Sequence, residues 1–440
     1  MDTKKARSLR PVPASADHGP ARVPGRSGKR ERRAGRPRIA LALAGGGPLG
    51  AIYEIGALCA LDESLDGLDL TQLDHYVGVS AGGFVAAALA NGMSPRELCA
   101  GFIENSDESA EVFDPSWLTV PAWGEFARRA IMLPGLTASA LWRLLVERRS
   151  LISALERLGP GLPTGAFASD EVDRRLARLF SRKGRTNDFR QLKTQLTLVA
   201  TNLDSGEAAP FGRPGWDHVP ISKAVQASSA LPGLFPPVEI DAHYFVDGAL
   251  KKTLHASVAL DEGMDLMLCL NPLVPFDATL PEVSRGKPAA GARIPRIVDG
   301  GLPSVLSQTF RSMIHSRMAL GMKGYERAYP DTDIVLFEPD PRDPELYLAN
   351  TFSYSQRRHL AEHAYQQTRH LLRSRRASFS ARFARHGIRL NMNALDDPKR
   401  QLVAPHKPAT RIGQALASLQ DVMENLGDLV AARARPRRAA

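Results

Sequence analysis

Ser80 lies in the segment GVSAG, residues 78–82, which matches the pattern G-x-S-x-G. In this pattern Gly78 and Gly82 permit a sharp turn between a strand and a helix, and the turn leaves the serine hydroxyl open to a substrate. The flanking segments fit such a turn, because an apolar run precedes the serine and the small-residue segment FVAAALANG follows it. The pattern therefore predicts that Ser80 is a nucleophile at a strand-to-helix elbow.

A glycine-rich loop, GGGPLG, follows the first apolar run of the chain and contains Gly45, Gly46, Gly47 and Gly50. Consecutive glycines leave backbone N–H groups unshielded, and the start of a helix adds positive potential, so the loop can hold either an oxyanion or a phosphate. A phosphate-binding P-loop needs G-x-x-x-x-G-K-[ST], and no lysine follows here. The sequence thus predicts an anion-binding loop and gives no support for nucleotide binding.

A serine nucleophile needs a base, and the residues alone leave two candidates open. Asp247 ends the apolar segment HYFV and precedes Gly248, so its carboxylate is expected at the same sheet edge as Ser80. Asp-Gly is also a common turn dipeptide. His255 follows Asp247 and keeps the Ser, Asp, His order of an α/β-hydrolase triad.

The elements that position these residues alternate between short apolar segments and helical patterns. Two strand-turn-helix units follow one another at the start of the ordered region, which predicts a parallel sheet covered by helices. The expected strands are residues 39–44, 75–79, 195–203, 243–248, 265–272 and 332–339.

Four segments occur in a fixed order: GGGPLG, GVSAGG, ASSALPGLFPPVEI and YFVDGA. Together they resemble the patatin-like phospholipase family across residues 39–340. The resemblance implies an α/β fold, a three-layer α/β/α sandwich with a mostly parallel central sheet. It implies a Ser80–Asp247 dyad without histidine, in which Asp247 is the general base. The implied oxyanion donors are Gly45, Gly46 and Gly47, and the implied motif glycines are Gly50, Gly78, Gly82 and Gly248.

The activity implied by the resemblance is hydrolysis of fatty-acyl esters in phospholipids or related lipids, with no metal and no cofactor. Two positions differ from the family's usual pattern. Leu49 stands where a basic residue is common, and residues 250–253 lack the asparagine that often follows the Asp-Gly pair. Neither position holds the implied dyad, so hydrolysis remains the expected chemistry.

The 440 residues carry a net charge of +10, and this charge is concentrated in a few segments. Residues 1–38 carry a net charge of +9 and residues 351–390 a net charge of +8. We expect a disordered basic arm over 1–38, a catalytic domain over 39–340, a helical basic extension over 341–432 and a basic tail over 433–440. These basic segments suit an anionic membrane, whereas the absence of aromatic residues from the arm argues against nucleic acid.

Residues 107–167 interrupt the alternation of strands and helices with a helical insertion that contains three of the four tryptophans. Leucine and isoleucine form one helical stripe in it, and we expect this stripe to pack on the sheet. Tryptophan also suits a membrane interface, so the insertion is alternatively a lid that meets lipid. The tryptophans are Trp117, Trp123 and Trp142, and the stripe comprises Leu141, Leu144, Leu145, Leu151, Ile152, Leu155 and Leu158.

The remaining features bear on location and partners. No transmembrane segment or signal peptide is visible, so we expect a cytoplasmic protein, in peripheral contact with a membrane where the basic segments bind one. His359 and His363 are expected on one helix face without a third metal ligand, and residues 411–432 are expected to form an amphipathic helix. A protein that chiefly binds membranes or granules, with a slow or inert site, is the alternative function. The three cysteines, expected to be buried thiols, are Cys59, Cys99 and Cys269.

Overall fold

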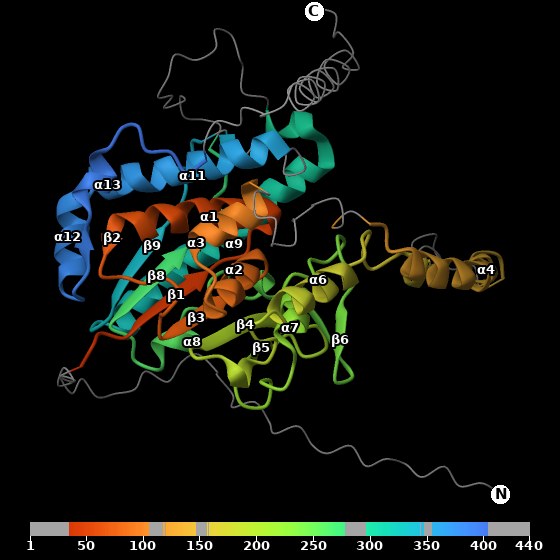
Figure 1. Cartoon of the computed structure of the whole chain (residues 1–440). Coiled ribbons are helices and arrows are strands. Elements are labelled where there is room, and N and C mark those ends of the chain that lie inside the picture. The colour runs from red at the N-terminus through yellow and green to blue at the C-terminus, as the bar shows by residue number, and fades with distance from the viewer. Residues whose placement is uncertain are drawn as a thin grey trace, which may run out of the picture.

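A computed structural model of the chain describes residues 35–104, 118, 120–146, 156, 158–277, 296–343, 345–346 and 354–403. Within these residues the main sheet has eight strands in the order β6-β7-β4-β3-β1-β8-β9, with β5 paired to β4 (Figure 1). The expected strands are all present. They are β1 Ile39–Leu43, β3 His75–Gly78, β4 Gln195–Asn202, β7 His243–Asp247, β8 Leu266–Leu270 and β9 Asp333–Phe337; β5 Ala208–Phe211 and β6 Val238–Ile240 were not expected.

The centre of the sheet is parallel and the β6-β7 end is antiparallel. β1 pairs in parallel with β3 on one side and β8 on the other, and β3–β4 and β8–β9 are also parallel. β5 and β7 pair antiparallel with β4, and β6 pairs antiparallel with β7. The prediction of a mostly parallel sheet is therefore confirmed.

Composition explains why β1 and β8 are central. Their sequences, IALAL and LMLCL, are buried along their whole length, as strands covered on both faces must be. Side chains alternate between the faces: Leu41 and Leu43 join one core cluster, whereas Ala40 and Ala42 join another. Each face of the sheet thus needs its own helical layer.

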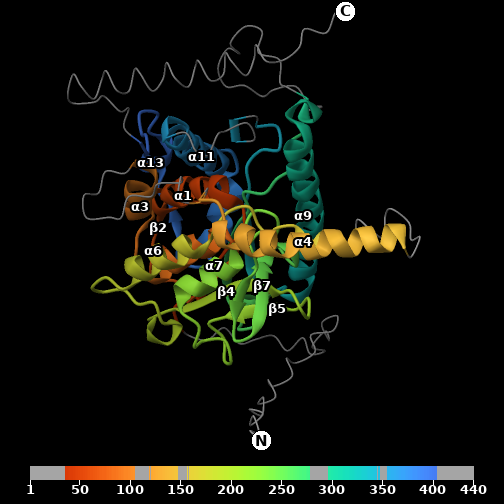
Figure 2. The ribbon, with the colours of Figure 1, turned by 90° about the vertical axis from the view of Figure 1, so that its right-hand side faces the viewer.

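Helices cover both faces of the sheet, which confirms the predicted three-layer α/β/α sandwich (Figure 2). On one face pack α8 (Ser257–Leu260) and α9 (Gly301–Ala328), where Met318 contacts the cluster of small strand residues. The other face is covered by α1 (Gly47–Ser64), α2 (Ala81–Ala90), α3 (Pro95–Leu98), α6 (Asp170–Phe180), α7 (Ile221–Ser228), α11 (Tyr354–Ser374) and α12 (Arg376–Ala384).

The helix α4 (Trp123–Leu145) extends away from the body instead of packing on the sheet (Figures 1 and 2). Leu141 and Leu145 are exposed. The expectation that the apolar stripe packs on the sheet is therefore wrong for these two residues. Hydrophobic periodicity predicts an amphipathic helix, but it does not specify which part of the protein covers the apolar side. Leu151, Ile152 and Leu155 lie outside the described residues, as does Trp117.

The basic segment near the C-terminus, which was expected to be helical, forms the two helices α11 and α12. α11 packs against α1 so closely that a side chain on Gly56 would come within 2.4 Å of the Ala361 carbonyl oxygen. Arg369 of α11 is buried, and its guanidinium donates to the carbonyl oxygens of Ala394 (2.6 Å) and Asp397 (2.8 Å). Burial and these contacts give this arginine a structural role instead of a surface one.

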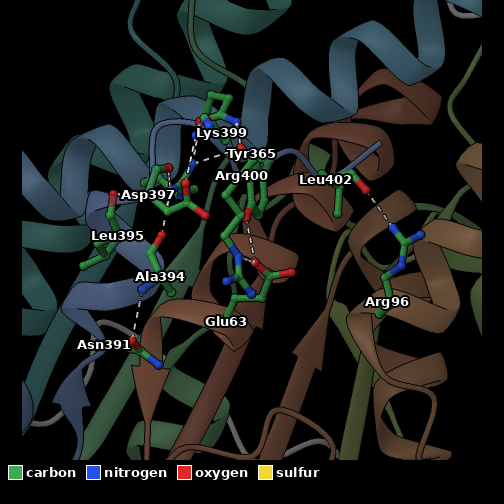
Figure 3. A network of polar contacts seen from close by, with 12 residues as sticks. Glu63, Arg96, Tyr365, Asn391, Ala394, Leu395, Asp397, Lys399, Arg400 and Leu402 are labelled. Carbon is green, nitrogen blue, oxygen red and sulfur yellow. Dashed lines mark hydrogen bonds and ion pairs between the residues drawn. The ribbon is translucent and has the colours of Figure 1, made fainter. Parts of the chain in front are cut away.

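Contacts around the α11 helix tie the end of the described chain to its beginning (Figure 3). Glu63 of α1 accepts hydrogen bonds from Tyr365 (2.6 Å) and Arg400 (2.5 Å), and Arg96 donates to the Leu402 carbonyl (2.9 Å). A small second sheet adds to this link. It pairs β2 (Leu65–Asp66) with β10 (Arg389–Leu390), which leads into α13 (Met392–Asp396).

Three further expectations concern the whole chain. Cys59, Cys99 and Cys269 are buried free thiols, as predicted. Among the described residues, none of the helices combines the length and apolarity that crossing a bilayer requires. The basic arm (apart from residues 35–38), the amphipathic segment 411–432 and the basic tail lie outside the described residues.

Candidate active site

Ser80 lies at the sharp turn between β3 and α2, where the sequence pattern placed it. Its backbone has φ 53° and ψ −126°, a conformation that residues with a side chain rarely adopt. The two pattern glycines allow close backbone approach: a side chain on Gly78 would lie 2.5 Å from the Gly83 Cα, and one on Gly82 would lie 2.5 Å from the Ala44 carbonyl oxygen. Both glycines are therefore required by packing around the serine.

The backbone of Ser80 is held by a second serine, Ser228, at the end of α7. The Ser80 N–H donates to the Ser228 Oγ at 2.8 Å, and that hydroxyl donates to the Val199 carbonyl on β4 at 2.6 Å. Ser228 is completely buried. Sequence reasoning gave it no role, although it belongs to the quoted segment ASSALPG.

Asp247 reaches Ser80 because of the strand register. Gly78 of β3 pairs with Leu198 of β4, and Ala200, two residues further along β4, pairs with Asp247 of β7. Ser80 is likewise two residues beyond Gly78, so the two side chains arrive at the same level on either side of β4. The structure brings them close enough together that Ser80 is among the groups that lower the pKa of the Asp247 carboxyl.

Burial controls the protonation of Asp247. The side chain is 3% exposed, and this desolvation raises the pKa of Asp247 from 3.8 to about 6. The hydrogen bond from the Ala249 N–H to Oδ1, at 2.8 Å, and the nearby Ser80 side chain act against the rise, because they favour the carboxylate. The result is a carboxylate that is charged at neutral pH and more basic than an exposed aspartate.

The glycine loop lies directly against Ser80. A side chain on Gly45 would come within 3.0 Å of the Ser80 Cβ and 3.7 Å of its Oγ, so only hydrogen fits there without displacement. Gly47 has φ +60°, which favours glycine, and begins α1. The N–H groups of Gly45, Gly46 and Gly47 have no hydrogen-bond partner within the part of the chain that the structure describes, so they remain available to an anion.

The other motif glycines shape the same region. Gly50 donates to the Gly46 carbonyl at 3.0 Å, which closes the loop, and Gly248 lies so near β4 that a side chain would come within 2.1 Å of the Val199 oxygen. The two departures from the family pattern do not disturb the site. Leu49 packs against the core, and Lys251 forms an ion pair with Glu207 at 2.6 Å.

His255, the alternative base, contacts a backbone carbonyl instead of Ser80. Its Nε2 is 3.4 Å from the Gly248 carbonyl oxygen, and burial lowers the pKa of His255 to about 3. Within the described residues, no hydrogen bond joins His255 to Ser80 or Asp247. His255 is therefore not placed to act as the base for Ser80.

Two other features lie apart from this site. A cavity of about 430 Å³ is lined by Arg38, His75 and Gln195, near the amino ends of β1, β3 and β4, at the sheet edge opposite Ser80. His359 and His363 share a face of α11, as expected, and contact the carboxylates of Glu345 and Asp343. Over the described part of the chain, His, Cys, Asp and Glu form no cluster suited to a metal ion.

Comparison with known proteins identifies the family. The family model described as patatin-like phospholipase matches residues 41–260, half of the chain. The protein is a member of the patatin-like phospholipase family. The matched range of this patatin-like chain contains Gly45, Ser80 and Asp247, and the family supports a lipid acyl hydrolase activity.

Solved structures similar to this patatin-like chain include bacterial effector proteins. VipD from Legionella pneumophila is 18% identical with a TM-score of 0.32, and the match covers 77% of this chain and 67% of VipD. The type III effector ExoU is 17% identical with a TM-score of 0.32, covering 77% of this chain and 53% of ExoU. The ExoU–SpcU complex of Pseudomonas aeruginosa is 19% identical with a TM-score of 0.23, covering 79% of this chain and 61% of the chain compared.

Proposed function

We propose that this protein is a serine lipid acyl hydrolase that cleaves fatty-acyl ester bonds of phospholipids or related lipids. Ser80 is the nucleophile, Asp247 is the general base, and the N–H groups of Gly45, Gly46 and Gly47 stabilise the oxyanion. The observation that carries this proposal is the placement of Ser80 and the buried carboxyl of Asp247 at the same level on either side of β4, with a glycine loop packed against the same serine.

In the acylation step, the Ser80 oxygen attacks the ester carbonyl carbon while its proton passes to Asp247. The carbonyl oxygen gains negative charge and binds at the 45–47 loop, whose donors are already oriented before the reaction begins. Collapse of the tetrahedral intermediate breaks the ester C–O bond. The proton held by Asp247 passes to the departing alcohol, and the acyl group stays on Ser80.

In the deacylation step, water replaces the alcohol. Asp247 accepts a proton from the water, the resulting oxygen attacks the acyl carbon, and the same loop holds the second oxyanion. The bond to Ser80 breaks, the serine oxygen recovers the proton from Asp247, and a fatty acid is released. One base with a pKa raised toward neutrality serves both steps, which supports a two-residue mechanism.

Covalent labelling with a fluorophosphonate probe tests the nucleophile. We expect the full-length protein to be labelled at Ser80, and we expect Ser80→Ala to abolish labelling. A panel of phospholipids and neutral acylglycerols then defines the substrate by release of free fatty acid. Labelling that persists in Ser80→Ala would refute the assignment.

A pair of variants tests the base. Asp247→Asn should remove turnover while the protein stays folded, because an amide does not accept the serine proton. His255→Ala should retain turnover, because His255 donates to a backbone carbonyl and does not contact the serine. The opposite pattern would establish the Ser-His-Asp triad instead. Activity retained in both variants would show that hydrolysis does not use this site.

A further inference from the structure

The projecting helix α4 presents apolar side chains to solvent along one of its sides. Ile131, Trp142 and Leu145 are 81%, 61% and 72% exposed. Their spacings of 11 and 14 residues place them on one side of an α-helix, since each spacing is close to a whole number of turns. The stretch from 130 to 142 contains no charged residue. An apolar side of this kind needs a partner.

The helix α9 has a second exposed apolar side on the same part of the molecule. Leu302, Leu306, Met313 and Leu320 repeat at intervals of four and seven residues, and all four are exposed. Figure 2 shows α9 at the edge of the body toward which α4 extends. We call the exposed apolar residues of these two helices together the α4–α9 face.

Both helices are connected to the segment that carries Asp247. Beside α4, the Ala122 N–H donates to the Ala166 carbonyl (3.0 Å), and the Ala166 N–H donates to the Gly233 carbonyl (3.2 Å), in the turn that follows α7. The Asp247 N–H donates to the Ala230 carbonyl (3.0 Å), at the start of that turn. The base of α4 is thus linked through backbone hydrogen bonds to the turn that also binds the Asp247 strand.

The other helix, α9, contacts the turn that follows Asp247. The Arg317 side chain donates to the Leu250 carbonyl at 2.9 Å, and the Thr253 hydroxyl donates to the Ile314 carbonyl at 3.4 Å. A surface that holds the α4–α9 face would therefore lie beside the site and not across the molecule from it.

The base of α4 is rigidly attached, so its apolar side has a fixed direction. Glu125 is 7% exposed and accepts hydrogen bonds from Arg129 (2.9 Å) and the Thr164 hydroxyl (3.0 Å). Arg129 also donates to the Pro160 carbonyl at 2.7 Å. This anchoring lowers the entropy that docking through α4 would cost.

Charge on the two helices selects the kind of surface. α4 contains three arginines and one glutamate, and α9 contains Arg311, Arg317, Lys323 and Arg327 against Glu326. Apolar residues with tryptophan, accompanied by an excess of cations, are typical of helices that lie in the interface of an anionic bilayer. Neither helix is long and apolar enough to span a membrane, so the contact is interfacial.

We propose that the α4–α9 face docks on an anionic lipid bilayer and holds the candidate site against its substrate. The inference rests on the proposed function for the identity of the substrate, but the docking itself is measurable without hydrolysis. Ile131, Trp142 and Leu145 enter the interface, and the net positive charge of both helices attracts the anionic lipid surface. The α4–α9 face acts in addition to the basic segments at the two ends of the chain.

Vesicle sedimentation of the full-length protein tests this docking, with vesicles of equal parts phosphatidylcholine and phosphatidylglycerol. The double variant Ile131→Ser/Trp142→Ser should bind at least about tenfold more weakly, because two apolar side chains no longer enter the interface. The matched control Ile131→Val/Trp142→Leu keeps both positions apolar and should bind within about threefold of the wild type. Vesicles of phosphatidylcholine alone should bind at least about fivefold more weakly than the mixed vesicles.

Two further measurements separate this proposal from the proposed function. Ser80→Ala should sediment with vesicles like the wild type, and the serine double variant should hydrolyse a soluble short-chain ester at the wild-type rate. Equal binding by the serine and apolar double variants, or no vesicle binding by the wild type, would overturn the docking proposal. So would a dimer that the serine variant dissociates without loss of vesicle binding, since the occupant would then be a second copy. Vesicle binding without any esterase activity would overturn the proposed function alone.

Discussion

Replacing Asp247 by Asn should stabilise the protein at neutral pH while it removes activity. Burial raises the pKa of Asp247 from 3.8 to about 6, which means that the folded protein binds this proton more tightly than the unfolded chain does. A difference of about two pH units between the two states corresponds to about 3 kcal/mol in the free energy of unfolding. Asparagine fills the same space without a charge to bury.

The pH range follows from the sign of the shift. Below about pH 3 the aspartate is protonated in both states, and it contributes no pH-dependent term. Between about pH 4 and pH 6 the folded state holds more protons than the unfolded state, so the wild type loses stability as the pH rises. Above about pH 6.5 the loss of stability is complete and no longer changes with pH. The variant lacks this loss of stability, so its advantage in the free energy of unfolding should grow by about 3 kcal/mol from pH 3 to pH 7.

Urea unfolding of both proteins at several pH values measures the difference in the free energy of unfolding. We expect this difference to rise between pH 4 and pH 6 and then to level off. A difference that is constant with pH, or that falls as the pH rises, would refute the assignment of a desolvated carboxylate at this position. The ionised form is also the active form, so kcat/KM should fall as the pH drops below about 6, with no second limb from an imidazole.

Three pairs of variants test the rest of the site. Ser80→Gly and Ser80→Ala should both be inactive, but the free energy of unfolding should be about 1 kcal/mol higher for Ser80→Gly, because glycine tolerates φ 53°. Equal stability of the two variants in urea would contradict the strained turn. Gly45→Ala should lower kcat at least about tenfold, because the added methyl group displaces Ser80. The control Gly124→Ala should leave kcat unchanged, because the space around Gly124 is open. Equal kcat values for the two variants would show that the loop has no part in the mechanism. Ser228→Ala should lower the free energy of unfolding by about 1–3 kcal/mol, because it leaves the Ser80 N–H unpaired. The control Ser229→Ala should lower it by about 0.5 kcal/mol or less. Equal denaturation midpoints for the two variants would contradict the contact between Ser228 and Ser80.

The sequence was sufficient for the sheet and the elbow because their signals are local. A fully apolar run such as residues 39–43 is typical of a buried strand, and the glycines around Ser80 mark a turn that only small residues allow. The link from Ser80 to Asp247 is different, since 167 positions separate them. The register of β7 on β4 brings them together, and no pattern within either segment specifies that register.

Other features were not predictable because they depend on what the rest of the chain covers. The sequence of α4 predicts an ordinary amphipathic helix. Trp142 and Leu145 are exposed to solvent only because of how the rest of the molecule is arranged. Ser228 resembles any polar residue at a helix end until its hydroxyl is seen between the Ser80 N–H and the Val199 carbonyl. Arg369 similarly belongs to a basic helix by composition, yet it is buried against backbone carbonyls.

The order of the strands has a consequence for how the chain matures on the ribosome. β1 and β3 are synthesised early, but the other neighbour of β1 is β8, which emerges more than two hundred residues later. Gly46 packs against Pro272, immediately after β8, and α1 is covered by α11 still later. The nascent glycine loop therefore waits with one flank of its strand, β1, open until β8 is made, so the growing polypeptide completes the sheet edge around Ser80 only late in translation.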